Sequence, residues 1–336
     1  MKVTDKDVYE PTVSIIVPAL NAEATIESLL ESLAEIDYDK QKLEVVVVDG
    51  QSTDRTRDIT RKYPVKLILQ NRKGLNLARN TGFRNSKGEI VLFTDSDCVV
   101  PRDWAKRMVK NFEATEVGCV GGSVSRYKHS FLSRYADDSI MPVLRKFKKR
   151  ELLENVEPPL RYPAGCNMGF RRSAVEEAGE FDEDIHYGFD EDELVERVCE
   201  AGYKMVLDPE TVNKHQYRDT FGGFLKQTFN YGRGGALLFK DKRTGARLAR
   251  WNLATLVLFV VWLIASVSLA FLAVNVSAVF LVPLVLIPLV PFVLLTLFYL
   301  YKGLEERDWV SAFTYPCMDV LRLIAYCTGE IYEAIR

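Results

Sequence analysis

The stretch Glu89-Ile-Val-Leu-Phe-Thr-Asp-Ser-Asp-Cys-Val-Val-Pro101 decides the fold class of this chain. Its unbroken apolar run, Ile90–Phe93, is typical of a strand that is buried on both faces of a parallel sheet. The run ends in two carboxylates, Asp95 and Asp97, that are separated by one residue. Ligands collect beyond the carboxyl ends of such strands, where alternate carboxylates can hold a divalent cation and a phosphate. The alternative is an ordinary helix cap before Pro101, so the neighbouring segments must decide.

Strand and helix patterns alternate on both sides of this stretch. Short runs of apolar and β-branched residues predict strands at residues 13–17, 43–48, 65–69, 90–93, 117–125 and 204–207. Apolar residues at helical spacing predict helices at residues 22–33, 52–62, 74–83, 103–114 and 190–201. Alternation of this kind, with right-handed crossovers, builds a mostly parallel sheet whose functional loops emerge at one edge. The predicted fold class is therefore α/β, with a Rossmann-like sheet and flanking helices.

Residues 126–161 interrupt this regularity with a charged segment that we expect to be helical. The segment contains the basic cluster Arg145-Lys-Phe-Lys-Lys-Arg150. One interpretation of the cluster is a solvated helix face, and the other is a patch attracted to anionic headgroups or a lipid phosphate.

Residues 251–301 contain no Asp, Glu, Lys or Arg, whereas the chain on either side is rich in charge. Two apolar stretches, 253–274 and 278–301, are each long enough to cross a bilayer of about 30 Å at about 1.5 Å per residue. Because only three residues separate them, they predict a transmembrane hairpin. Basic residues precede the first span and follow the second, which predicts both termini on the cytoplasmic side of the cell membrane.

The sequence thus predicts three parts: a cytoplasmic α/β domain at residues 1–250, the hairpin at 251–301, and an amphipathic helical tail at 302–336. The tail mixes apolar residues such as Trp309 and Ile331 with charges at helical intervals. It could lie in the membrane interface or pack on the catalytic domain.

Charge and cysteine content narrow the class of protein. Four of the 44 basic and six of the 46 acidic residues follow Tyr301, so the chain before Trp251 holds 40 of each sign and is neutral. A nucleic-acid-binding domain would carry a basic excess, so we expect no nucleic-acid partner. The six cysteines are scattered, which predicts reduced, mostly buried thiols, and the polar N-terminus lacks the apolar core of a secretory signal. Both features favour a cytoplasmic catalytic domain.

Six motifs occur between about Val13 and Gly234 at mutually compatible spacings. They are Pro18-Ala-Leu-Asn21, Val48-Asp-Gly-Gln-Ser-Thr-Asp54, Gly74-Leu-Asn-Leu-Ala-Arg-Asn80, Asp95-Ser-Asp97, Gly165-Cys-Asn-Met-Gly-Phe-Arg-Arg172 and Asp190-Glu-Asp-Glu-Leu194. With these motifs in this order, the chain resembles the family 2 glycosyltransferases, which are inverting enzymes of the GT-A fold. The resemblance implies transfer of a sugar from a nucleotide sugar, with Mg²⁺ or Mn²⁺ as cofactor.

A nucleotide site is expected at the ends of the first strands. Asp49 ends the second predicted strand and can accept hydrogen bonds from the base of a UDP- or GDP-sugar. Arg79 is placed to meet the diphosphate, as is Lys73, although a solvated helix face is the competing interpretation of both. The residues expected to bind nucleotide or diphosphate are Pro18, Ala19, Asn21, Asp49, Lys73, Gly74, Arg79 and Asp95.

The resemblance also implies a metal site and an acceptor pocket. Asp97 and Asp95 are the expected metal ligands, and His215 is expected to add a metal or diphosphate contact, although a lone histidine is often structural. Gln227-Thr-Phe-Asn-Tyr231 looks like a degenerate form of the Gln-x-x-Arg-Trp element of processive synthases, which favours transfer of a single sugar. The residues expected to line the sugar or acceptor pocket are Asn167, Met168, Gln227, Tyr231 and Arg233.

The general base is expected among the acids at residues 190–193. In the family, a Glu-Asp pair precedes a variable residue, an acid and Leu. Here Leu194 sets a register that puts Glu191 at the base position with Asp190 before it, in inverted order. Asp192 follows Glu191 in the usual order but one residue out of register, and we favour it slightly as the base. Favourable charge at a helix N-terminus is the alternative explanation of these acids.

Together these features predict a membrane-anchored enzyme that adds one sugar to a lipid-linked acceptor. Dolichyl or polyprenyl phosphate, or a diphosphate-linked glycan on such a lipid, is the expected acceptor, because the spans hold the active site beside the headgroups. The alternatives are a glycolipid synthase with a diacylglycerol-like acceptor and a non-catalytic, nucleotide-sugar-binding scaffold. Only the inverted Asp190-Glu191 order favours the scaffold.

Overall fold

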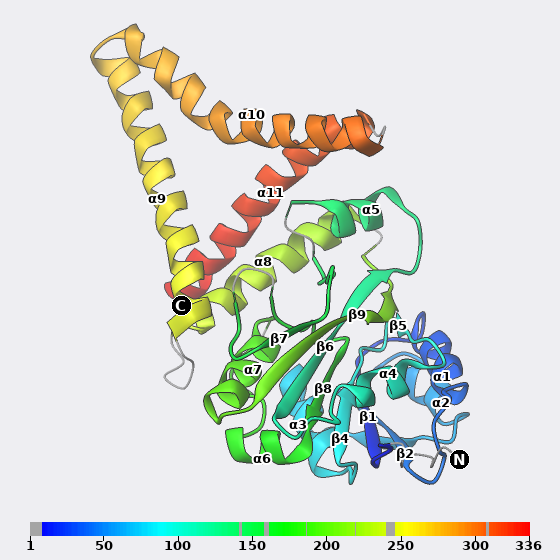
Figure 1. Ribbon diagram of the computed structural model, residues 1–336. Coiled ribbons are helices and arrows are strands. Elements are labelled where there is room, and N and C mark those ends of the chain that lie inside the picture. The colour runs from blue at the N-terminus through cyan, green and yellow to red at the C-terminus, as the bar shows by residue number, and fades with distance from the viewer. Residues whose placement is uncertain are drawn as a thin grey trace, which may run out of the picture.

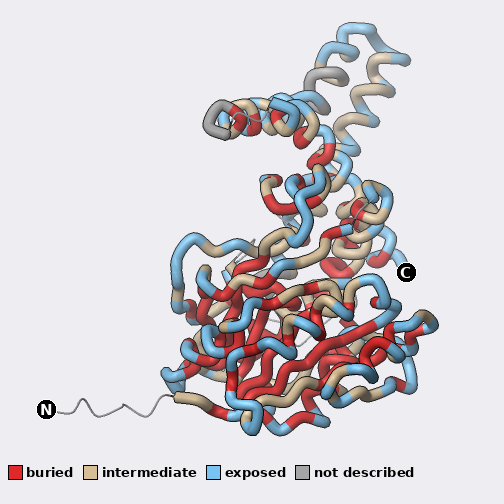
Figure 2. Tube along the Cα trace, turned by 90° about the vertical axis from the view of Figure 1, so that its right-hand side faces the viewer, coloured by how far each residue is buried: buried red, intermediate tan, exposed pale blue. Residues whose placement is uncertain are grey.

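The computed structural model describes residues 9–140, 143–157, 161–185, 187–218, 220–239, 246–306 and 309–336. A mixed sheet with helices on both faces forms the main body, and long C-terminal helices extend away from it (Figure 1). Buried residues concentrate in the sheet and in the helices that cover it, whereas the hairpin of α9 (Ala246–Asn275) and α10 (Leu281–Glu306) is largely exposed (Figure 2).

The described residues form a nine-stranded sheet in the order β3-β2-β1-β4-β8-β6-β9-β5, with β7 paired to β9. The strands are β1 (Val13–Ala19), β2 (Leu43–Asp49), β3 (Lys66–Leu69), β4 (Ile90–Phe93), β5 (Cys98–Val99), β6 (Val117–Arg126), β7 (Glu151–Leu153), β8 (Met168–Arg171) and β9 (Lys204–His215). The first four strands pair in parallel, whereas β8 runs antiparallel to both β4 and β6. The carboxyl ends of β1, β2 and β4 therefore meet at one edge, where ligands bind in open sheets.

Helices cover both faces of the sheet. They are α1 (Ile26–Ala34), α2 (Thr56–Thr60), α3 (Leu75–Arg84), α4 (Trp104–Lys110), α6 (Arg172–Ala178) and α7 (Asp190–Glu200). Successive side chains of β1 point to opposite faces, so that Ile15 and Val17 pack with α1 and α4 while Ile16 packs with α3 and α7. All of β1 is buried, which explains its almost unbroken apolar run.

Strand β9 is longer than the prediction of residues 204–207. Its second half is rich in polar residues, so the apolar run that marks a buried strand stops early. Asn213 in this half is nevertheless buried, because its Nδ2 donates a hydrogen bond to Cys166 O at 3.0 Å. The predicted boundary is therefore wrong, and the extension carries His215 to the edge of the sheet that holds Cys98.

The expectation of a helical segment at residues 126–161 is wrong for most of its described part. Helix α5 (Phe131–Asp138) accounts for the beginning of the segment, but the basic cluster 145–150 forms a loop. This loop runs beside the end of β6, where Val124 N donates a hydrogen bond to Arg145 O at 2.8 Å. Because the backbone bonds to the sheet instead of forming helical turns, the cluster is not a helix face.

The C-terminal part contains one helix, among the described residues, that is long and apolar enough to cross a membrane. This is Ala249–Asn275 within α9, which has a mean hydropathy of 2.7 and is almost entirely exposed. A short 3₁₀ turn, Ala278–Phe280, connects it to α10. In α10, the described residues Phe292–Gly303 form a shorter apolar helical segment. The structure does not describe the side chains at 285–288 and 291.

The tail forms α11 (Trp309–Ala334), which packs along α8 (Phe221–Leu237) (Figure 1). The two helices approach so closely that a Cβ at Gly232 would overlap Tyr326 O, and one at Gly329 would overlap Phe229 O. The other face of α11 exposes apolar side chains: Trp309, Val310, Phe313, Leu321, Ile324 and Tyr332. One face of the tail thus packs on the main body, and the other is suited to a membrane interface.

Candidate active site

The loops after β1 and β2 lie side by side, as the sequence predicts. Pro18 and Ala19 end β1, and Ala19 pairs with Asp49 at the end of β2. Asn21 then ties the two loops together, because its Oδ1 accepts a hydrogen bond from Thr53 N at 2.9 Å. Asn21 has a φ of 50°, a left-handed conformation that asparagine adopts more readily than most residues.

Asp49 is buried with one carboxylate oxygen already engaged. Its Oδ1 accepts a hydrogen bond from Ser52 N at 3.0 Å and lies 3.4 Å from Arg57 Nε. Its Oδ2 and both polar side-chain atoms of Gln70 are buried and have no hydrogen-bond partner in the described part of the chain. Such atoms are costly to leave unpaired, so this corner suits a ligand with donors and acceptors along one edge, such as a nucleotide base.

Arg79, on α3, joins the strand ends to the acidic helix. Its side chain is buried, forms an ion pair with Asp190, and lies 3.9 Å from Asp95 Oδ1. Burial alone would lower the pKa of Arg79, but the charges of Asp190 and Asp95 raise it overall. Arg79 is therefore not on a solvated helix face. Lys73, just before Gly74 at the start of α3, is exposed and forms no ion pair with the residues described.

The pairing of β5 with β9 brings a histidine to the second carboxylate of the Asp-Ser-Asp motif. Cys98 is in register with His215, and His215 Nε2 lies 3.2 Å from Asp97 Oδ1. The ligating atoms of Asp97, Cys98 and His215 lie within 4.8 Å of one another. Burial alone would lower the pKa of His215, but the charge of Asp97 raises it to about 9.

This group of side chains fits a divalent cation. Asp95 and Asp97 offer the hard oxygen ligands that Mg²⁺ and Mn²⁺ prefer, and His215 adds a nitrogen. Burial raises the pKa of Asp95, and the neighbouring charge of Asp97 raises it further despite the presence of Arg79. A bound cation would stabilise the charged form of Asp95, which burial and the charge of Asp97 disfavour.

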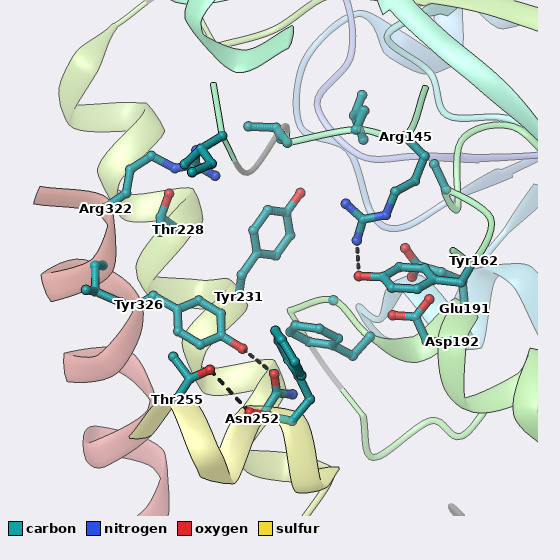
Figure 3. A pocket seen from close by; sticks show the side chains of 18 of the residues that line it. Arg145, Tyr162, Glu191, Asp192, Thr228, Tyr231, Asn252, Thr255, Arg322 and Tyr326 are labelled. Atoms are coloured by element: carbon teal, nitrogen blue, oxygen red, sulfur yellow. Dashed lines mark hydrogen bonds between the residues drawn. The ribbon is translucent and has the colours of Figure 1, made fainter. Parts of the chain in front are cut away.

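Four acids begin α7, and two of them are used to hold the fold. Asp190 pairs with the arginine of α3, and Glu193 accepts a hydrogen bond from Arg197 Nη2 at 2.6 Å. Glu191 and Asp192 instead line a cavity (Figure 3). Favourable charge at a helix N-terminus therefore does not by itself account for these acids.

The two cavity acids have different neighbours. A Cβ at Gly165 would lie 3.5 Å from Glu191 Cδ and would crowd the guanidinium of Arg79, so Glu191 lies on the side of the strand ends. Burial and the charge of Asp190 raise the pKa of Glu191 to about 7. Burial and the charge of Glu191 raise the pKa of Asp192 well above its usual range, and the nearest opposing charge is that of Arg145.

The cavity has a volume of about 420 Å³ and extends from these acids to the helices at the C-terminal end. Figure 3 shows Arg145 and Tyr162 close to Glu191 and Asp192, with Asn252 of α9 and Tyr326 of α11 on the opposite side. Its lining residues are Ile140, Val143, Leu144, Arg145, Tyr162, Pro163, Ala164, Gly188, Phe189, Glu191, Asp192, Thr228, Tyr231, Trp251, Asn252, Thr255, Leu295, Asp319, Arg322, Leu323 and Tyr326.

Only some of the residues expected in an acceptor pocket lie at this cavity. Tyr231 lines it, and Gln227 Nε2 donates a hydrogen bond to the Tyr231 hydroxyl at 3.1 Å. Asn167 is buried in the sheet, where its amide donates to Ser123 O and Thr211 O and accepts from Trp104 Nε1. Met168 is buried on β8, and Arg233 pairs with Glu333 at 2.7 Å, outside the cavity lining.

The chain has clear relatives among known proteins. The family model "Glycosyl transferase family 2" matches residues 14–179. Glycosyltransferase AglE of Haloferax volcanii is 31% identical over 256 residues, which cover 72% of this chain and 80% of that protein. The chain belongs to glycosyltransferase family 2.

Two further proteins are similar to this chain, one in sequence and one in fold. Dolichyl N-acetyl-alpha-D-glucosaminyl phosphate 3-beta-D-2,3-diacetamido-2,3-dideoxy-beta-D-glucuronosyltransferase of Methanococcus voltae is 23% identical over 245 residues, covering 68% of this chain and 74% of that protein. Mannosyltransferase PcManGT from Pyrobaculum calidifontis, solved in complex with GDP-Man and Mn²⁺, aligns with a TM-score of 0.66 at 23% identity over 97% of this chain and 88% of its own. The fold is GT-A, as the sequence predicts, and the chain is a glycosyltransferase.

Proposed function

We propose that this family 2 enzyme transfers a single sugar from a UDP- or GDP-sugar to a lipid-linked acceptor at the cytoplasmic face of a membrane. The observation that carries the proposal is the cavity, which has Glu191 and Asp192 at one end and side chains of α9, α10 and α11 at the other. An acceptor bound there would have its reacting group beside the acids and its lipid beside the apolar helices. The names of the relatives are consistent with this, since the Methanococcus voltae protein is named for a dolichyl-linked sugar phosphate.

The donor would bind at the ends of β1, β2 and β4. We assign the base to the corner of Asp49 and Gln70, where buried polar atoms lack partners among the residues described. Asp95, Asp97 and His215 would hold Mg²⁺ or Mn²⁺, which stabilises negative charge on the departing diphosphate. Both GDP-Man and Mn²⁺ are present in the solved PcManGT complex, which supports this choice of ligands.

We assign the general base to Glu191 rather than to Asp192, which the sequence alone favours slightly. Glu191 holds the family's base position in the register set by Leu194, lies on the side of the strand ends, and has a pKa raised to about 7 by burial and Asp190. A base with a pKa near the working pH is efficient. Glu191 takes the proton of an acceptor hydroxyl while the oxygen of that hydroxyl bonds to the anomeric carbon of the donor sugar. The bond from that carbon to the diphosphate breaks on the opposite face, which inverts the configuration.

The membrane part completes the proposal. We take residues 1–250 as the catalytic domain, 251–301 as a transmembrane hairpin and 302–336 as an interfacial tail, with both termini in the cytoplasm. The support is the long exposed apolar helix in α9, the turn that returns the chain through α10, and the exposed apolar face of α11.

The proposal is tested by incubating membranes that contain the full chain with labelled nucleotide sugars and Mn²⁺ and then extracting the lipids. We expect label in the lipid phase from one donor sugar, and no label with Glu191→Gln. Asp192→Asn should retain more activity than Glu191→Gln, and the reverse order would overturn the assignment of the base. If no donor labels lipid although the protein binds nucleotide, the chain is a binding scaffold and not this enzyme.

A further inference from the structure

Arg145 is a half-buried cation in the cavity lining that neither the donor site nor the general base uses. Its Nη2 donates a hydrogen bond to the Tyr162 hydroxyl, and its guanidinium carbon lies 4.1 Å from the centre of that ring. Its Nε is buried and has no hydrogen-bond partner, and Arg145 forms no ion pair, within the described residues. The charges of Asp192 and Glu191 act on Arg145, but neither carboxyl forms an ion pair with it, so its guanidinium is suited to an anionic ligand.

The rest of the cavity lining indicates which kind of anionic ligand would fit beside Arg145. Beyond Arg145 the wall becomes apolar through Ile140, Trp251, Leu295 and Leu323, which come from the loop before Arg145 and from α9, α10 and α11. A freely soluble anion would gain nothing from such a wall. A phosphate attached to a hydrocarbon chain would match both the arginine and the apolar surface.

A second arginine and three carboxyls also line the cavity. Arg322 of α11 contributes a second guanidinium to the lining, and it is held in place by a hydrogen bond from its Nη1 to Ser139 Oγ at 3.2 Å. The carboxyls that face these arginines are Glu191, Asp192 and Asp319. Burial raises the pKa of Asp192 and of Asp319, whereas the hydroxyls of Tyr135 and Tyr299 donate hydrogen bonds to Asp319 and lower its pKa. Arg322 Nη1 lies 3.9 Å from Asp319 Oδ1, whereas Arg145 forms no such ion pair within the described residues.

We propose that Arg145 binds the phosphate of the acceptor lipid, and that the acceptor is therefore a lipid phosphate that already carries a sugar. This inference rests on the proposed function. Arg145 and Glu191 line the same end of the cavity (Figure 3), so a phosphate held by Arg145 leaves the hydroxyls of the attached sugar to face Glu191. Tyr162 orients the guanidinium, and the lipid chain leaves between α9, α10 and α11.

Binding measurements on the full chain in detergent test this without requiring turnover. The probes are a short-chain polyprenyl monophosphate, the parent polyprenol and inorganic phosphate, each followed by tryptophan fluorescence, to which Trp251 on the cavity wall contributes. We expect the monophosphate to bind about 10- to 100-fold more tightly than the polyprenol, as a charge-assisted contact provides. Arg145→Gln should abolish this difference, Arg145→Lys should restore part of it, and Lys148→Gln, at an exposed position of the same loop, should leave it unchanged.

Several outcomes would overturn the inference. Equal affinity for monophosphate and polyprenol in the unmodified chain would show that no phosphate site exists, and an undiminished preference in Arg145→Gln would show that Arg145 does not form it. Inorganic phosphate that binds as tightly as the lipid phosphate would exclude a lipid site. Nucleotide binding in the presence of Mn²⁺ verifies that each variant is folded. Failure of the proposed function is a separate result, because it appears as absent sugar transfer even where the preference for lipid phosphate is present.

Discussion

The assignment of Glu191 as general base predicts a specific dependence of sugar transfer on pH. Burial and the charge of Asp190 raise the pKa of Glu191 to about 7, and the residue acts as a base only when it is ionised. Activity should therefore rise with pH. Between pH 6 and pH 8 the ionised fraction of a group with this pKa increases about tenfold. The ionised fraction of an ordinary glutamate, whose pKa is ~4.3, changes by only about 2% over the same range.

The assay is kcat/KM for the lipid acceptor, measured at saturating donor from pH 5.5 to 8.5. Because the pKa of His215 in the donor site is raised to about 9, the charge of that residue changes at the upper end of this range. Nucleotide affinity in Mn²⁺ is therefore measured over the same range, and transfer is corrected for it. Glu191→Gln should lose about 10²- to 10⁴-fold in rate, and its residual activity should lack the rise near pH 7. A corrected profile that stays flat from pH 6 to 8, or one that Glu191→Gln retains, would refute the assignment.

Three further predictions concern stability, each measured by thermal or chemical unfolding in detergent. Gly329→Ala adds a methyl group that overlaps Phe229 O at the crossing of α8 and α11, so it should lower the free energy of unfolding by about 1–3 kcal/mol. Gly222→Ala, which adds a methyl group in open space on α8, should leave stability unchanged. Equal effects of the two substitutions would contradict the close packing of α8 and α11. Asp190→Asn removes the closer of the two carboxylates beside buried Arg79, leaves only Asp95 at 3.9 Å, and should cost about 3–5 kcal/mol. Asp58→Asn, in the exposed pair with Arg61, should be nearly neutral, and similar losses would argue against a buried pair. Burial raises the pKa of Glu330 to about 8, so the folded protein holds a proton that the unfolded chain releases at lower pH, and stability should fall by up to ~1.4 kcal/mol per pH unit as the pH rises toward 8. Because the pKa of Glu191 is also raised, to about 7, Glu330→Gln should reduce this slope without abolishing it, most clearly between pH 7 and pH 8. An unchanged slope would show that Glu330 does not titrate in this range.

Much of the sheet could be predicted from the sequence because buried parallel strands leave a local signal. Ile90–Phe93 is a strand over the same residues that its apolar run indicates, and β1 and β2 differ from the expected runs only at their carboxyl ends. The second half of β9 gave no such signal, because Asn213 is buried through hydrogen bonds to distant backbone and not through apolar character. The loop at 145–150 was mistaken for a helix because its charged composition does not reveal that Arg145 bonds to β6.

The candidate site divides in the same way. Residues next to strand ends, such as Asp49 and Asp97, could be placed because topology brings parallel strand ends together. Gln70, Arg145 and Tyr326 were missed as site residues, since their positions depend on loops and on helices that meet only in the folded chain. Arg145 has a partial signal in the sequence, because it belongs to a basic cluster that is suited to a lipid phosphate. Asn167 lies beside the right motif, but its amide holds the sheet together.

The central claim is that one sugar passes from a nucleotide sugar to a lipid-linked acceptor. Mass spectrometry of the lipid product tests this most directly. The reaction contains the purified full chain, Mn²⁺, a polyprenyl-phosphate-linked sugar as acceptor, and the nucleotide sugar that gives labelled lipid in the membrane assay. The account predicts that the acceptor gains the mass of one sugar residue and that Glu191→Gln yields no such product. A ladder of several added sugars, or release of free sugar from the donor with no change in the mass of the lipid, would contradict it.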